Sequence, residues 1–253
     1  MSSSGLKTTN FKIMTNDNKQ HKPLDSTEPA IAYSTCYRLP FLSLFHADCM
    51  EIMKQYPDKY FDLAIVDPPY GLGNRLSDGG GKLKNTPMAV LYREKDWDIL
   101  PKKEYWSELF RISKNQVVFG ANYFLEYLTN TRGFVCWDKK QDMPTLSACE
   151  LVWTSLDKPA KIMKQSSTDL ERFHPTQKPI YVYDFMLNYC KVKQGDKILD
   201  THFGSGSIAL AVDKANRLDK MNLHLTACEI DKEYIDKAIK RISESIKQGT
   251  LSF

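Results

Sequence analysis

Residues 61–70 read FDLAIVDPPY, and this stretch decides how the chain folds. Its first part, Asp62–Val66, is an apolar run without polar alternation, which predicts a strand buried on both faces of a parallel sheet. The run ends in Asp67-Pro68-Pro69-Tyr70, where two prolines fix φ and remove N–H donors. A stiff corner at a strand end therefore presents a carboxylate, carbonyl acceptors and an aromatic ring, which suits an amino group with two N–H donors.

A second strand-end motif begins at Asp200, 130 positions after Tyr70. Lys197–Leu199 predicts a strand, and the Gly-rich turn Asp200–Ser207 (DTHFGSGS) lets the backbone approach a ligand before a helix begins. The next strand, Leu223–Ala227, ends near Glu229, an acid placed to accept two ribose hydroxyls. The turn lacks the third glycine of a dinucleotide fingerprint and carries no basic side chain. A nucleoside such as S-adenosylmethionine therefore fits better than NAD.

Outward from these motifs, further short apolar runs alternate with helical patterns. This alternation predicts an α/β fold with a mostly parallel sheet covered on both faces. The other predicted strands are Phe41–His46, Gln116–Gly120, Gly133–Trp137 and Glu150–Ser155, and the predicted helices are Cys49–Tyr56, a helix after Pro179, Ile208–Asn216 and Asp231–Ile246.

Composition narrows the class of protein. The chain has 253 residues and a net charge of +4, which suits one domain and permits a polyanionic partner. We expect a flexible polar tail over 1–32 and a single catalytic domain over 33–253, with polar loops at 71–96 and 156–174. No run of 18 apolar residues and no secretory signal is present, and the six cysteines are scattered without a C-x-x-C pair. These features predict a cytoplasmic protein with reduced thiols, no membrane contact and no metal site.

With these motifs in this order, the chain resembles the S-adenosylmethionine-dependent DNA amino methyltransferases of the permuted beta group, over roughly residues 38–247. The resemblance implies a circularly permuted Rossmann-like fold with a mostly parallel seven-stranded sheet and one antiparallel edge strand. It rests on four segments: the strand ending at Asp48, the tetrapeptide Asp67–Tyr70, the segment His174–Pro179 (HPTQKP), and the turn Asp200–Ser207 with Glu229. Thr201 and His202 depart from the family, which usually has proline and Phe or Trp there.

The resemblance also implies roles for individual residues. The catalytic set is Asp67, Pro68, Pro69 and Tyr70, with one amine N–H bound by the Asp67 carboxylate, the other by the Pro68 carbonyl, and Tyr70 stacked on a flipped base. His202 is expected to be a structural or cofactor-wall residue. The implied cofactor-binding residues are Asp48, Thr176, Lys178, Asp200, Phe203, Gly204, Ser205, Gly206, Glu229 and Ile230.

The substrate implied is double-stranded DNA, in a restriction–modification context. In this family Asp or Asn before Pro-Pro-Tyr goes mostly with adenine N6 and Ser with cytosine N4, so Asp67 favours adenine. Cytosine N4, an RNA amine and an inactive DNA-binding subunit are the alternatives, and a dehydrogenase is the weakest. The family also commonly forms homodimers. Basic residues of the two loops are the DNA-contact candidates: Arg75, Lys82, Lys84, Arg93, Lys158, Lys161, Lys164 and Arg172.

Overall fold

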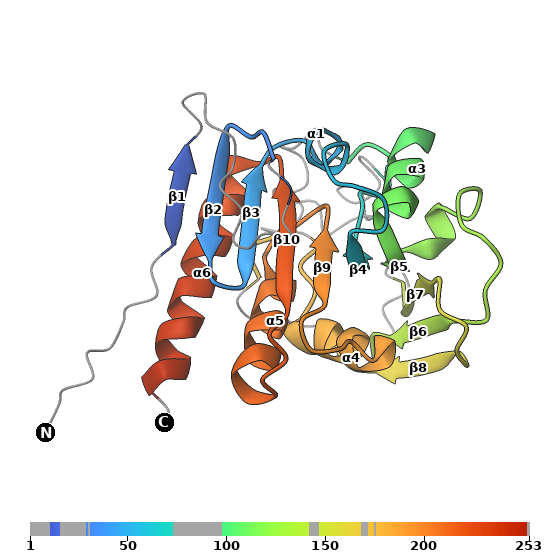
Figure 1. The fold of residues 1–253 in the computed structure, drawn as a ribbon. Helices are drawn as coiled ribbons and strands as arrows, with labels where there is room; N and C mark the ends of the chain where they lie inside the picture. Colours follow the sequence, from blue (N-terminus) through green and yellow to red (C-terminus); the bar gives the residue numbers. More distant parts are fainter. Residues whose placement is uncertain are drawn as a thin grey trace, which may run out of the picture.

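The computed structural model in Figure 1 describes residues 11–15, 29, 31–72, 98–141, 147–167, 172–174 and 176–251. Its strands are β1 (Lys12–Thr15), β2 (Thr35–Leu39), β3 (Leu42–His46), β4 (Phe61–Val66), β5 (Ser113–Val118), β6 (Phe134–Asp138), β7 (Cys149–Thr154), β8 (Lys161–Lys164), β9 (Lys197–Asp200) and β10 (His224–Glu229). Its helices are α1 (Cys49–Met53), α3 (Lys103–Ile112), the 3₁₀ turn η3 (Ala121–Tyr123), α4 (Ile180–Cys190), α5 (Ser207–Leu218) and α6 (Lys232–Leu251).

In the described part of the chain, ten strands form one sheet in the order β1-β2-β3-β10-β9-β4-β5-β7-β6-β8. The prediction of seven strands with one antiparallel edge strand was wrong in its count and in its edges. The seven strands predicted from the sequence form the continuous stretch from β3 to β6, but β1, β2 and β8 extend it. Antiparallel pairs occur at β1–β2, β2–β3, β5–β7 and β7–β6.

The three additional strands explain the error. β2 turns back on β3 through a tight turn at residues 40–41, and its apolar residues resemble one run with those of β3. β1 and β8 are edge strands, which need backbone pairing rather than a two-faced apolar pattern. β1 lies inside the predicted tail and pairs with β2, whereas residues 1–10, 16–28 and 30 lie outside the described residues.

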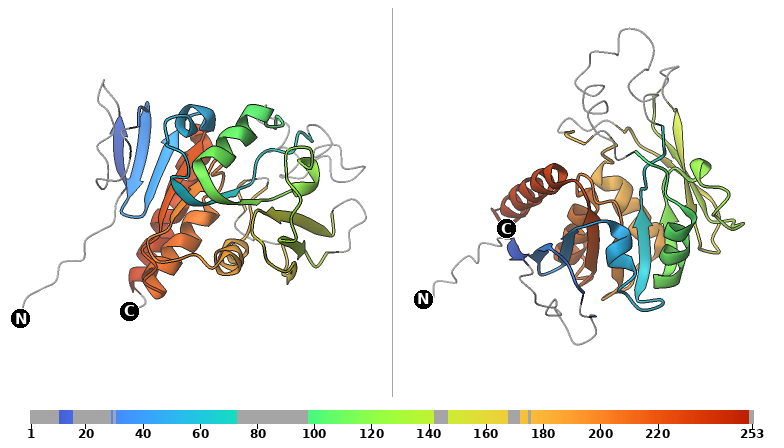
Figure 2. Two further views of the ribbon diagram at one scale, coloured as in Figure 1. Left: turned by 45° about the vertical axis from the view of Figure 1, so that its right-hand side comes forward. Right: turned by 90° about the horizontal axis from the view of Figure 1, so that it is seen from above.

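The sheet is buried on both faces because helices cover both. Along β4, Leu63 and Ile65 pack into one core, while Phe61, Ala64 and Val66 pack into the other. The first core also contains the apolar faces of α4, α5 and α6, and the second those of α1 and α3. Figure 2 shows these two groups of helices on opposite sides of the sheet. The expected three-layer α/β arrangement is therefore present.

The strand order brings the two motifs side by side. β4 and β9 are parallel neighbours, although β9 follows β4 by more than a hundred residues in the chain. β9 and β10 fill the space between β3 and β4, so the carboxyl ends of all four strands meet at one edge. Ligands of open α/β sheets bind at such an edge.

None of the helices in the described ranges is long and apolar enough to cross a membrane.

Candidate functional site

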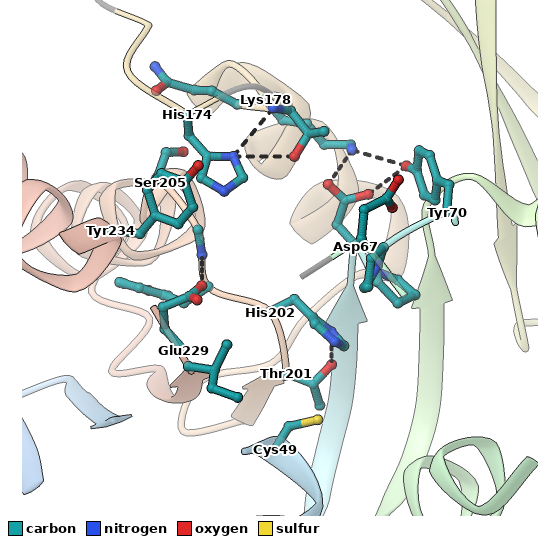
Figure 3. A pocket seen from close by; sticks show the side chains of 18 of the residues that line it. Cys49, Asp67, Tyr70, His174, Lys178, Thr201, His202, Ser205, Glu229 and Tyr234 are labelled. Carbon is teal, nitrogen blue, oxygen red and sulfur yellow. Dashed lines mark hydrogen bonds and ion pairs between the residues drawn. The ribbon is translucent and has the colours of Figure 1, made fainter. Parts of the chain in front are cut away.

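A cavity of about 370 Å³ lies at the carboxyl ends of β3, β4, β9 and β10. Figure 3 shows its two ends, with Glu229 and Tyr234 at one and Asp67 and Tyr70 at the other. Of the predicted site residues, those that line the cavity are Asp48, Asp67, Pro68, Pro69, Tyr70, Thr176, Lys178, Phe203, Gly204, Ser205, Glu229 and Ile230. Asp200 and Gly206 do not line it.

Glu229 organises the turn at one end of the cavity. Its carboxylate accepts the backbone N–H of Gly204 at 2.8 Å through Oε2 and that of Asp231 at 2.9 Å through Oε1. Burial raises the pKa of Glu229, while these N–H groups oppose the rise. Since each carboxylate oxygen has a second lone pair, Glu229 can still accept hydrogen bonds from a diol.

Two features favour glycine at position 204 in this turn. Its φ of +51° lies in the left-handed region, and a Cβ there would lie 3.3 Å from the ring of His174. That ring packs edge-on against Tyr234, with centroids 4.2 Å apart, and its Nδ1 lies 3.2 Å from the Thr176 hydroxyl. Burial lowers the pKa of His174 to about 3, and Lys178 adds to the effect, so the imidazole is neutral. Residues 174 and 176–178 thus form one wall of the cavity.

Asp200 and Gly206 support the turn from behind. Asp200 is 2% exposed, and its Oδ1 accepts the backbone N–H of His202 at 3.0 Å. Burial raises the pKa of Asp200 to about 8, although that N–H opposes the rise. Gly206 has a φ of +72° and precedes α5, and a Cβ there would lie 3.1 Å from atoms of Ile242 and Phe203. The resemblance implied that both residues bind the cofactor, but neither lines the cavity.

At the other end, Asp67 is held by two partners. The ammonium of Lys178 lies 2.6 Å from Asp67 Oδ2, and the hydroxyl of Tyr70 donates to Asp67 Oδ1 at 2.6 Å. Lys178 is 5% exposed and its ammonium also lies over the ring of Phe119, 4.6 Å from the centroid. The resemblance assigned Lys178 to the cofactor; in the structure Lys178 pairs with the Asp67 carboxylate and also lines the cavity, so the cofactor role stays a prediction.

Glu150 completes this corner, and sequence reasoning missed it. One carboxylate oxygen lies 3.0 Å from the Lys178 ammonium and accepts the Tyr70 hydroxyl at 3.2 Å, while the other lies 2.9 Å from the Lys139 ammonium. Burial would raise the pKa of Glu150, but Lys178 and Lys139 outweigh it and lower that pKa to about 2. Two carboxylates and two ammonium groups therefore form a balanced cluster.

Charges in this cluster act on Asp67 in opposite directions. Burial raises the pKa of Asp67, Lys178 opposes the rise, and the negative charge of Glu150 adds to it. Burial lowers the pKa of Lys178, but Asp67 and Glu150 outweigh burial and raise it. Together these effects leave the pKa of Asp67 raised, and Lys178 is the cation that opposes the rise. Within the described residues no other cation contacts Asp67.

Tyr70 is fixed by packing as well as by its hydroxyl. Its ring stacks on Tyr123 with centroids 4.8 Å apart and an interplanar angle of 15°. Gly120, with a φ of +61°, leaves room for it, because a Cβ there would lie 2.3 Å from Tyr70 Cε1. Neither Gly120 nor Tyr123 was identified from the sequence, although a glycine ending a buried strand is a signal for a close approach.

Asp48 is the N-cap of α1, and its Oδ1 accepts the Met50 N–H at 2.8 Å. It lies on the cavity wall with Ile230, whose side chain is exposed. Both residues therefore line the cavity, and the cofactor contacts that the resemblance implies for them stay predictions.

The predicted DNA contacts receive uneven support. Arg75, Lys82, Lys84 and Arg93 lie outside the described residues. Lys158 donates to the Tyr189 carbonyl at 2.7 Å, at the end of α4 away from the cavity, and Arg172 donates to the carbonyls of Ser167 and Gln177, both at 3.0 Å. Lys161 and Lys164 are exposed on the edge strand β8. DNA contact by these residues stays a prediction.

Comparisons with known proteins point in one direction. Residues 132–240 match the family described as DNA methylase, N6_N4_Mtase. The type II methyltransferase M2.DpnII of Streptococcus pneumoniae is 26% identical over 251 residues, covering 79% of this chain and 88% of that protein.

Solved structures share the fold. The PvuII DNA methyltransferase, described as cytosine-N4-specific, superposes with a TM-score of 0.54 at 13% identity, covering 88% of this chain and 95% of that one. A complex of M1.HpyAVI with SAM has a TM-score of 0.50 at 21% identity, covering 79% of this chain and 98% of that one. The matched family segment contains Glu150, Lys178, Gly204 and Glu229, while Asp67 lies before it. In sequence, residues 132–240 are similar to the N6/N4 DNA methylases, and in fold the chain is similar to the PvuII enzyme.

Proposed function

We propose that this chain transfers a methyl group from S-adenosylmethionine to the N6 amine of adenine in DNA. The observation that carries the proposal is the position of Asp67, whose carboxylate lies on the same cavity as the nucleoside-type turn at Gly204 and Glu229. DNA methylation at an exocyclic amine follows from the family match, and adenine follows from the acid at position 67.

The cavity fits a nucleoside cofactor. The absence of a side chain at Gly204 leaves space beside the His174 ring, which a Cβ at this position would reduce. Glu229 retains lone pairs that can accept hydrogen bonds from ribose hydroxyls. Asp48 lies at the same wall, and its carboxylate is an acceptor suited to an amine. When bound, S-adenosylmethionine supplies a methyl group on a positively charged sulfur.

At the amine, the chain contributes position and electrostatics. The Asp67 carboxylate accepts one N–H and the Pro68 carbonyl accepts the other, because the diproline corner fixes both at the cavity wall. Hydrogen bonds to both N–H groups favour a pyramidal nitrogen with its lone pair free to attack. Lys178 favours the ionised form of Asp67, which is the form that accepts an N–H, and the stack of Tyr70 on Tyr123 offers an aromatic platform for an extruded base. No protein nucleophile is needed.

The test is a product analysis. The protein is incubated with labelled S-adenosylmethionine and duplex DNA, and the nucleosides are separated by mass after digestion. We expect N6-methyladenine, and we expect none above background with Asp67→Ala. Absence of any methylated nucleoside in the wild-type reaction refutes the proposal.

The same measurement separates the alternatives. N4-methylcytosine as the product would show that the target base is cytosine rather than adenine. A methylated amine found only in RNA would show that the substrate is RNA rather than DNA. Binding of cofactor and DNA without turnover would identify an inactive subunit. The likeness to the cytosine-N4-specific PvuII enzyme shows only the fold at 13% identity, so it does not favour cytosine here. The predicted homodimer has no support in the structure and stays a prediction.

A further inference from the structure

One part of the cavity wall departs from the family resemblance, namely Thr201 and His202 after β9. Both residues line the cavity. They join with Tyr105 of α3 in a continuous hydrogen-bonded chain: the Tyr105 hydroxyl lies 2.7 Å from Thr201 Oγ1, which lies 2.9 Å from His202 Nδ1. A proline at position 201, as in the family, would have no hydroxyl for this chain.

The direction of the chain follows from Tyr105. Its side chain is 4% exposed, and among the described residues Thr201 is the hydrogen-bond partner of its hydroxyl. A buried O–H without an acceptor is costly, so Tyr105 donates to Thr201. Burial also raises the pKa of Tyr105 well above its usual value, so the phenol keeps its proton. The hydroxyl of Thr201 then donates to His202 Nδ1.

This direction fixes where His202 carries its own proton. Burial lowers the pKa of His202 to about 4, and the nearby charge of Asp48 opposes that shift only in part, so the ring is neutral at pH 7. A neutral imidazole that accepts through Nδ1 must donate through Nε2. In the described part of the chain Nε2 has no protein partner, and the ring forms part of the cavity wall (Figure 3).

A hydrogen-bond donor therefore stands near the acceptor Asp48. The carboxylate of Asp48 lies close enough for its charge to act on the His202 ring. Its Oδ1 accepts the Met50 N–H. An acceptor next to a donor complements an adenine edge, where the amine is a donor and the neighbouring ring nitrogen is an acceptor. A base with a carbonyl in place of the amine has the opposite pattern.

We propose that His202 is a specificity-determining residue that donates its Nε2–H to a ring nitrogen of an adenine bound beside Asp48, and that Tyr105 and Thr201 are positioning residues that hold it in this tautomer. This adenine is the adenine ring of the cofactor, and that identification rests on the proposed function. The target base is the other source of the same chemistry.

The first experiment reads the tautomer without any ligand. Nitrogen NMR of the ¹⁵N-histidine-labelled protein is expected to show His202 protonated at Nε2. Tyr105→Phe removes the donor at the head of the chain and is expected to give a mixture of tautomers. The control is Tyr127→Phe, because both tyrosines pack on Trp106, whereas in the described part of the chain the hydroxyl that contacts Thr201 is that of Tyr105. Protonation at Nδ1 in the wild type overturns the inference.

The second experiment reads the hydrogen bond to the ligand. Calorimetric titration without DNA compares S-adenosylhomocysteine with its 1-deaza and 7-deaza analogues. His202→Phe keeps an aromatic wall, and we expect it to weaken binding of the parent ligand about 3- to 10-fold. We expect no such loss for the analogue that lacks the accepted nitrogen.

The outcomes separate this inference from the proposed function. If the His202→Phe loss occurs only in the KM for DNA, and is absent for DNA carrying the deaza base, the adenine is the target base. If the wild type binds cofactor and His202→Phe changes neither constant, the inference is overturned while the proposed function stands. If the wild type neither binds an adenine nucleoside nor methylates DNA, the proposed function fails, and this inference fails with it.

Discussion

Replacing Lys178 by methionine tests whether this buried cation keeps the acceptor Asp67 ionised. The Lys178 ammonium lies 2.6 Å from Asp67 and 3.0 Å from Glu150, so the substitution leaves two buried carboxylates without it. An opposite charge at contact distance shifts a carboxyl pKa by about 1–3 units. We therefore expect the pKa of Asp67 to rise by about this amount in Lys178→Met. Each unit corresponds to about 1.36 kcal/mol, or a factor of ten in the ionised fraction once the pKa exceeds the assay pH.

The assay is the pH dependence of kcat for methyl transfer to DNA. Protonation of Asp67 removes the acceptor, so the acid limb of the profile follows the pKa of Asp67 in the folded protein. Lys178→Met is expected to move the acid limb up by about 1–3 pH units, with partial recovery of the rate at alkaline pH. Glu150→Gln removes a negative charge that raises the pKa of Asp67, so the limb is expected to move down.

Shifts of the acid limb in opposite directions in Lys178→Met and Glu150→Gln distinguish an effect on the pKa of Asp67 from general damage to the site. Lys139→Met is the matched control, because Lys139 touches Glu150 and not Asp67, and its effect on the limb is expected to be the smallest. Removing one partner from a buried ion pair costs about 3–5 kcal/mol of stability, so each variant is also checked by urea denaturation and cofactor binding. Limbs that move in the same direction in Lys178→Met and Glu150→Gln, or a loss independent of pH, refute the reasoning.

Other parts of the site give predictions of their own. Gly120→Ala places a Cβ 2.3 Å from Tyr70 Cε1 at a φ of +61°. We therefore expect kcat to fall about tenfold or more, while calorimetry shows an unchanged cofactor affinity. An unchanged kcat would contradict the role of Gly120 in placing Tyr70. Glu229→Gln removes the charged acceptor of two backbone N–H groups and is expected to weaken cofactor binding about 10- to 100-fold by titration, whereas unaltered binding would place the nucleoside elsewhere. The pKa of Asp200 is about 8, so it is largely protonated at pH 7, and a bound cation should lower that pKa and release protons. Calorimetry in buffers of different ionisation enthalpy measures this release, and zero released protons would be the contrary result.

The sequence predicted the parts of the site that lie on parallel strands. Asp67, Gly204 and Glu229 each follow a buried apolar run, and parallel strands bring all their carboxyl ends to one edge of the sheet. A single rule therefore located residues that are distant in the chain. Because a turn ends each of these strands, the glycines and acids at the ends stand out from the apolar runs before them.

Glu150 lies outside that rule because β7 runs antiparallel to β5. An antiparallel strand brings its first residues, not its last, to the same edge, and an apolar run does not reveal the direction of its strand. The same limit applies to Lys178, whose partner Asp67 depends on how the His174–Pro179 segment folds over the cavity. Pairings between charged residues more than a hundred positions apart depend on strand direction and on the reach of the side chains. The local sequence pattern predicts neither of these.

The insertion of β9 and β10 between β3 and β4 has a consequence for how the protein is made. β3 and β4 are close in the chain but are separated in the sheet by two strands that a ribosome synthesises last. During synthesis, β4 has β5 on one side and an unpaired edge on the other, open to intermolecular pairing until β9 arrives. Contacts of such long sequence separation form slowly, so the nascent chain is expected to depend on chaperones at this stage. Truncation before β9 should divide the sheet between β3 and β4 rather than shorten it at an edge.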